Sequence, residues 1–91
     1  MAHKQFTVQI VTVANALFDG AASELQCKGV GGEITILADH EPLITRIEPC
    51  NIRVRTQDGE EQSFAIGGGV LEVADNKAVV LCSSDERDLP A

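Results

Sequence analysis

Apolar and polar residues alternate along much of the chain, and this period of two is typical of half-buried β-strands. Near the start, Phe6, Val8 and Ile10 fall on one face, while Thr7 and Gln9 fall on the other. The alternation predicts a strand with one face against a core. No segment sustains the 3.6-residue period of an amphipathic helix.

The next two segments are less regular. Residues 17–20 read Leu-Phe-Asp-Gly, so we expect them to end on a turn. Residues 21–28 are ambiguous, because their alanines suit a short helix whereas Leu25 and Cys27 alternate with polar residues. We predict a strand for this second segment.

The second half of the chain predicts two hairpins. The alternating segment 52–56 is followed by Asp58-Gly59, a tight-turn dipeptide, and then by a return strand. Strands at 70–73 and 78–82 flank Asp75-Asn76, two residue types that tolerate left-handed backbone. Turn signals every 8 to 12 residues or so predict an all-β fold, a compact antiparallel sandwich or barrel.

The length and net charge of the chain exclude several classes of function. A chain of 91 residues has room for one folded domain. Its net charge of −7 is the wrong sign for nucleic acid or anionic lipid. No apolar run reaches the roughly 20 residues of a membrane span, so we expect no direct insertion into lipid.

Candidate chemistry is sparse. The three cysteines are not arranged as a Cys-x-x-Cys pair and are expected to be buried, reduced thiols. The glycine clusters at 29–32 and 67–69 lack the Lys-Ser/Thr of a phosphate loop, which favours structural roles for them. His40 has no partner spaced for a metal site and is expected to bond a nearby backbone group. We therefore expect no catalytic residue, cofactor or metal, and the residues alone indicate a binding or assembly domain.

Three segments carry a resemblance to a known family. They are 29–45 (GVGGEITILADHEPLIT), 64–73 (FAIGGGVLEV) and 79–82 (VVLC), and the start of the chain also fits. The chain resembles the N-terminal domain of the epsilon subunit of bacterial F-type ATP synthase, called delta in mitochondria. The resemblance covers nearly all of residues 5 to 84 and implies a flattened sandwich of two five-stranded sheets.

The resemblance also implies a function. Such a domain is a non-catalytic part of the central stalk, which rotates with the gamma subunit and the ring of c subunits and is linked indirectly to alpha and beta. Glu33 matches the position that faces the polar loops of the c ring. His40 and Ile44 match positions on the face packed against gamma, whereas Leu43 is expected in the core. The implied location is peripheral, on the cytoplasmic face of the bacterial plasma membrane.

Several positions depart from the family pattern. Thr35 and Asp39 stand where the family prefers glycine, and Gly67 adds a third glycine to the usual pair. We expect an epsilon-type domain over residues 1–84 and an acidic tail over 85–91, without the C-terminal helical hairpin of typical members or its ATP binding. The alternative reading is a free-standing β-sandwich module that binds a ligand.

Overall fold

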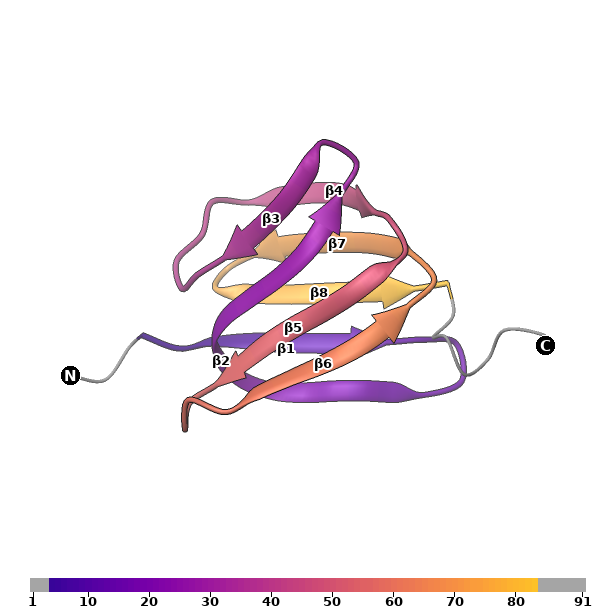
Figure 1. Ribbon diagram of the computed structural model, residues 1–91. Helices are drawn as coiled ribbons and strands as arrows, with labels where there is room; N and C mark the ends of the chain where they lie inside the picture. The colour runs from indigo at the N-terminus through magenta and orange to yellow at the C-terminus, as the bar shows by residue number, and fades with distance from the viewer. Residues whose placement is uncertain (1–3, 84–91) are drawn as a thin grey trace.

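Eight β-strands and no helix make up residues 4–83, the part of the chain that the computed structural model describes (Figure 1). The strands are β1 (Phe6–Val11), β2 (Ala16–Gly29), β3 (Gly32–Ile36), β4 (Leu43–Ile47), β5 (Cys50–Thr56), β6 (Glu61–Ile66), β7 (Gly69–Ala74) and β8 (Lys77–Cys82). The all-β class is confirmed. The expected tail at 85–91 lies outside the described residues.

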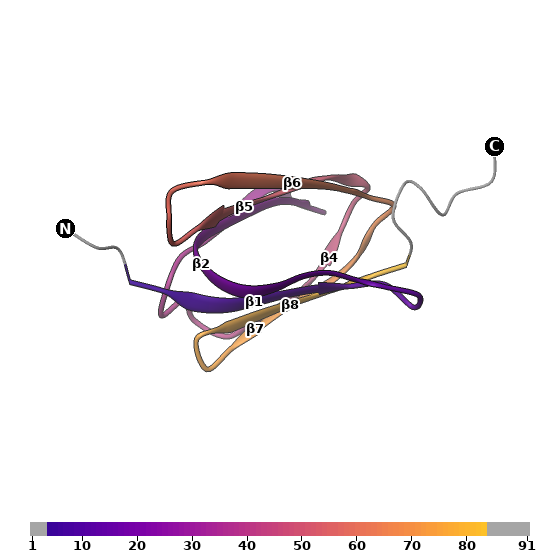
Figure 2. The same ribbon diagram turned by 90° about the horizontal axis from the view of Figure 1, so that it is seen from below.

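The strands form two layers packed face to face, seen edge-on in Figure 2. One layer has the order β2-β1-β8-β7-β4, and the other has the order β3-β2-β5-β6. Strand β2 belongs to both layers, because its first half pairs with β1 and its second half pairs with β5 and β3. The sandwich is confirmed, but over the described residues one layer has five strands and the other has four, where the resemblance implied five in each.

Two details differ from the sequence-based expectation. Strands β1 and β8 run parallel, although every other neighbouring pair is antiparallel. They come from opposite ends of the chain, so no tight turn fixes their relative direction. The turn expected at residues 17–20 is wrong, because these residues pair with β1 inside β2 and the bend lies at 13–14. The strand predicted for residues 21–28 is confirmed as the second half of β2.

The core lies between the layers and is built from the alternating apolar residues. Its largest fully buried side chains come from every strand except β6, and they are Val8, Ile10, Leu25, Ile36, Ile47, Ile52, Val54, Leu71, Val73 and Val80. Phe18 of β2 and Phe64 of β6 meet edge to face with ring centroids 6.0 Å apart. This contact joins one edge strand of each layer.

Both predicted hairpin turns are present. The β5–β6 turn has Gly59 at φ 84°, and the Thr56 N–H donates to the Glu60 carbonyl across its base. The β7–β8 turn holds Asp75 at φ 52° and Asn76 at φ 60°, the left-handed pair that a two-residue hairpin needs.

The second glycine cluster has the structural role expected for it. Gly68 adopts φ 113°, a conformation that other residues rarely adopt. Gly69 begins β7 directly against β8, where an added Cβ would clash with the Leu81 carbonyl oxygen. The neighbouring backbone belongs to a ladder partner and cannot swing aside as a flexible side chain could.

We predict that Gly69→Ala destabilises the domain by about 2 kcal/mol, because overfilling a packed site forces the backbone apart. Urea unfolding followed by circular dichroism measures the effect. Gly31→Ala is the matched control, since nothing lies within 4 Å of a Cβ there. Equal stability of the two variants would contradict the close approach of β7 and β8.

Candidate docking surfaces

The outer face of the five-stranded layer carries apolar side chains on four adjoining strands. Alternate residues of a strand point to the same face, so the register decides which of them meet. Val70 lies opposite Leu81, and Leu81 lies opposite Val11. Ile44 and Val79 lie in the next row, one on each side of a glutamate of β7. We call Val11, Ile44, Val70, Val79 and Leu81 the outer strip.

The outer strip is open to solvent. Ile44 is 72% exposed, Leu81 54% and Val70 39%, while the other two side chains are half-buried. Leu43, next to Ile44, packs against the core instead, as the alternation predicted. A depression of about 380 Å³ adjoins the strip and is lined by Pro42, Leu43, Ile44, Glu72, Val73 and Ala74. A contiguous exposed apolar surface of this kind is typical of an interaction site.

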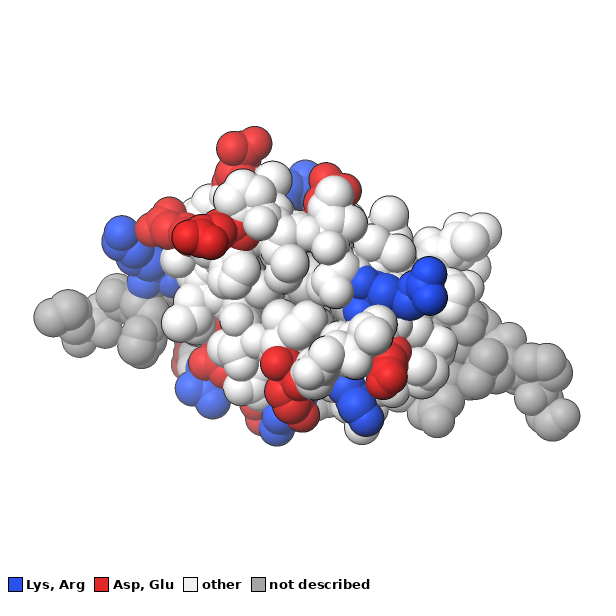
Figure 3. All heavy atoms as spheres, turned by 90° about the horizontal axis from the view of Figure 1, so that it is seen from above, with Lys and Arg blue, Asp and Glu red and all other residues white. Residues whose placement is uncertain are grey.

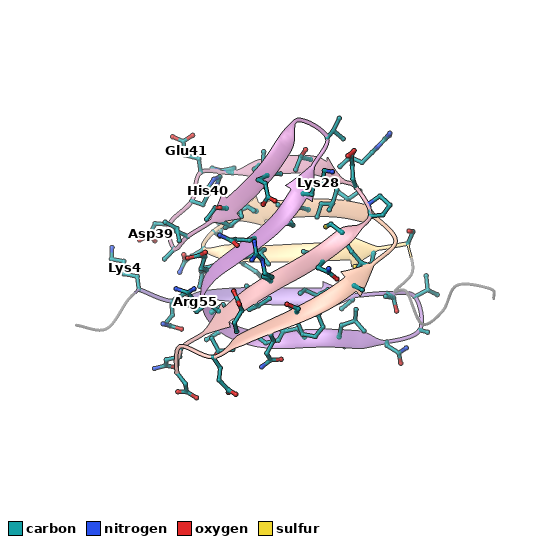
Figure 4. The ribbon with its side chains drawn as sticks, in the orientation of Figure 1. Lys4, Lys28, Asp39, His40, Glu41 and Arg55 are labelled. Carbon is teal, nitrogen blue, oxygen red and sulfur yellow. The ribbon has the colours of Figure 1, made fainter. Side chains whose placement is uncertain are left out.

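His40 lies in the turn that connects β3 to β4 (Figure 4). Its Nδ1 is 2.7 Å from the Glu41 carbonyl oxygen, so the expected bond to a nearby backbone group is confirmed. A carbonyl oxygen only accepts hydrogen bonds, and Nδ1 therefore carries the proton. In the neutral ring this leaves Nε2 as an acceptor for a donor on another molecule.

The same turn is tied to two distant segments. Asp39 adopts φ 63°, and its backbone N–H donates to Oδ1 of Asn76 at 2.7 Å. Lys4 Nζ lies 3.1 Å from Asp39 Oδ2, and Figure 4 shows the two side chains meeting beside the turn. The turn is thus held by Lys4, which precedes β1, and by Asn76 in the β7–β8 turn.

Glu33 lies near the start of β3, exposed on the outer face of the four-stranded layer. It is the ladder partner of Lys28 in the β2–β3 hairpin, whose tip exposes 63% of Val30. A shallow depression of about 450 Å³ adjoins it, lined by Gln26, Cys27, Lys28, Glu33, Cys50, Asn51, Arg53 and Ser63. The hairpin tip therefore presents a carboxylate among polar and cationic groups.

The thiols are free, as expected, but they are not all buried. Cys27 and Cys82 are buried, whereas Cys50 is half-buried because it begins β5 at the corner after Pro49. Burial, together with smaller contributions from the nearby Cys50 and Glu33, raises the pKa of Cys27 to about 12. A thiol with this pKa is neutral and unreactive at physiological pH.

Two of the three predicted site residues lie on the side of the same layer, and the third lies on the other layer. His40 and Ile44 lie in and just after one turn, on the side of the five-stranded layer. Glu33 lies on the outer face of the other layer. In the view from above, charged side chains lie around the rim with uncharged surface between them (Figure 3). The outer strip and Glu33 thus lie on different layers of the sandwich.

Sequence reasoning missed most of the outer strip. A signal was present, because residues 78–82 read Ala-Val-Val-Leu-Cys without a polar residue between them. An unbroken apolar strand has two apolar faces, and in a two-layer sandwich only one of them meets the core.

Among the described residues, no group of three or more His, Cys, Asp or Glu side chains could hold a metal ion. No helix there could cross a membrane.

Comparison with known proteins identifies the fold and the family. The family "ATP synthase, Delta/Epsilon chain, beta-sandwich domain" matches residues 5–88, and the chain belongs to this family. The ATP synthase epsilon chain of Chromohalobacter salexigens is 38% identical over 82 residues, which is 90% of this chain and 58% of the relative. That of Acinetobacter baumannii strain AYE is 40% identical over 78 residues, or 86% of this chain and 56% of the relative.

Two solved structures share the fold at low identity. A chain of the Euglena gracilis mitochondrial ATP synthase superposes with a TM-score of 0.83 at 16% identity, covering 99% of this chain and 59% of that one. A chain of the Tetrahymena thermophila mitochondrial ATP synthase central stalk and c ring gives 0.75 at 15% identity, covering 100% and 74%. The chain spans a little over half the length of the curated relatives it matches.

The raised pKa of Cys27 predicts a pH dependence of stability. Between pH 9 and 12 the unfolded thiol loses its proton and the folded thiol keeps it, so the unfolded state binds fewer protons. The free energy of unfolding should therefore fall as the pH rises through this window. Cys27→Val should remove most of the fall measured by urea unfolding, whereas Cys50→Ala, which removes only a smaller cause of the shift, should leave most of it in place. An unchanged slope in Cys27→Val would contradict the assignment.

Proposed function

We propose that the chain is a non-catalytic rotor subunit of the central stalk of an F-type ATP synthase. It links the gamma subunit to the c ring and so couples ion translocation to ATP synthesis. The observation that carries the proposal, beside membership of the family, is the exposed outer strip on an otherwise well-packed sandwich. Small-molecule sites are usually concave and bury most of the ligand, whereas the depressions that adjoin Glu33 and the outer strip are open to solvent.

The outer strip and His40 form the surface for gamma. Interface centres are mostly apolar and depleted in charge, and the strip is apolar except for Glu72, which lies between Ile44 and Val79, with Arg46 at its border. Ile44 is the most exposed member, so it gains most from burial against a partner. His40 Nε2 adds a hydrogen-bond acceptor near the end of the strip.

The β2–β3 hairpin forms the surface for the c ring. Glu33 presents its carboxylate to cationic or amide groups on the polar loops of the ring, and Val30 at the tip adds apolar contact. With the two surfaces on different layers, one small domain contacts both partners at once. The subunit sits peripherally at the cytoplasmic face of the membrane, binds no cofactor and meets alpha and beta only through gamma.

Affinity purification of the chain at native abundance tests the proposal. We expect gamma, alpha and beta to be recovered with it, together with the c ring when mild detergent is used. A tagged chain recovered without any of these subunits would overturn the proposal. Recovery with a single small-molecule ligand would support the ligand-binding alternative instead.

We predict that Ile44→Asp weakens binding to gamma by tenfold or more, because a charge at an apolar interface centre loses its solvation without gaining a partner. At 72% exposure the substitution should leave the melting temperature of the isolated chain nearly unchanged. Val30→Asp is the matched control, an exposed apolar residue on the other surface. Calorimetric titration with gamma measures the difference, and an unfolded Ile44→Asp chain would place Ile44 in the core.

We predict that Glu33→Gln weakens docking to the c ring modestly, by under about 1 kcal/mol, because exposed ion pairs contribute little. The defect should shrink at high salt, where the wild-type attraction is screened as well. Glu61→Gln on β6 is the control, an exposed glutamate of the same layer. Co-sedimentation with c-ring vesicles at two ionic strengths gives the measurement, and a defect that grows with salt argues against a charge contact.

A further inference from the structure

Asn76 connects three segments that are far apart in the sequence. Its side-chain Oδ1 accepts the backbone N–H of Asp39 at 2.7 Å, and its Nδ2 donates to the Gln5 carbonyl at 2.9 Å. Its own carbonyl accepts the N–H of Thr7 at 3.2 Å. Asn76 therefore bonds both to the residues at the start of β1 and to the turn between β3 and β4.

The contact with Asp39 falls where the chain needs support. Asp39 holds φ 63° at a position where the family prefers glycine, and only a few residue types tolerate this conformation. Without the amide oxygen of Asn76, the Asp39 N–H would lose this hydrogen bond. Lys4 supplies a second tie through the Asp39 carboxylate, but both side chains are largely exposed and such pairs are weak.

Asn76 can make this contact because of its own backbone. At φ 60° in the β7–β8 turn it is left-handed itself, and asparagine adopts this conformation more readily than most residues. Its amide also offers an acceptor and two donors on one short side chain, so it can bond two backbones at once.

We propose that Asn76 is a positioning residue for gamma docking. By holding Asp39 it fixes the turn 37–42, and this turn presents His40 and leads into β4, the strand that carries Ile44. A surface that is already in its bound arrangement loses less conformational freedom when the partner arrives, and so binds more tightly. The inference rests on the proposed function in one respect, that gamma contacts this turn and the outer strip.

Asn76→Gly is the decisive variant, because glycine keeps the left-handed backbone and removes only the side-chain bonds. Asp75→Gly is the matched control, a substitution at the other left-handed residue of the same turn. We expect exchange of the Asp39 amide proton, followed by NMR, to accelerate by about tenfold or more in Asn76→Gly and to stay unchanged in the control. Affinity for gamma should fall by about fivefold to thirtyfold in Asn76→Gly alone.

Asn76→Asp separates positioning from general stability, since it keeps an acceptor for the Asp39 amide and loses the donor to Gln5. Protection of the Asp39 amide and most of the affinity should return in this variant. An unchanged exchange rate of the Asp39 amide proton in Asn76→Gly would show that the side chain of Asn76 does not hold this turn. Accelerated exchange with unchanged affinity, while Ile44→Asp still weakens binding, would overturn the positioning role and leave the proposed function standing. If Ile44→Asp has no effect either, the gamma surface is wrong and the positioning role fails with it.

Discussion

Strand β2 is the element on which the sandwich depends, because it is hydrogen bonded in both layers. It changes partners near Ala22, where the register shifts and the small, fully buried side chain lets the backbone bend between the layers. Its first half supports β1 and with it the layer of the outer strip. Its second half supports β3 and places Glu33 on the opposite face. The separation of the two docking surfaces follows from this one strand.

Local signals were enough for much of the fold. The hairpins at Asp58-Gly59 and Asp75-Asn76 were predictable because each turn needs left-handed backbone and each sequence supplies residues that tolerate it. The parallel pairing of β1 with β8 was not predictable, since it joins residues about seventy positions apart through no turn. The bend at residues 13–14 was missed as well. This bend is held by the Thr12 hydroxyl, which accepts two backbone N–H groups. A lone threonine is a weaker turn signal than the Asp-Gly pair at 19–20, which led to the wrong prediction.

The candidate site was predictable only in part. Glu33, His40 and Ile44 came from the resemblance to a family, and the exposure of Ile44 beside the packed Leu43 fits the face assigned to it. Leu81 could not be assigned to a surface without knowing which strands adjoin, because residues 78–82 are apolar on both faces. Val70 lies on the same face as Glu72, and only the order of the strands shows that it adjoins Leu81. Asn76 was recognised as a turn residue, but its bonds to Asp39 and Gln5 depend on contacts across the whole fold.

The parallel pairing of β1 and β8 has a consequence for synthesis in the cell. Strand β1 leaves the ribosome before the other described strands, yet one of its two neighbours is β8, the last of these strands to emerge. The β5–β6 hairpin can form early from local contacts, whereas the five-stranded layer stays open along β1 until residue 82 has emerged. Closing so long a loop makes folding slow relative to helical domains of this size. One backbone edge of β1 therefore stays unpaired during translation. Unpaired strand edges favour aggregation, so the nascent chain is prone to aggregate until β8 has emerged and paired with β1.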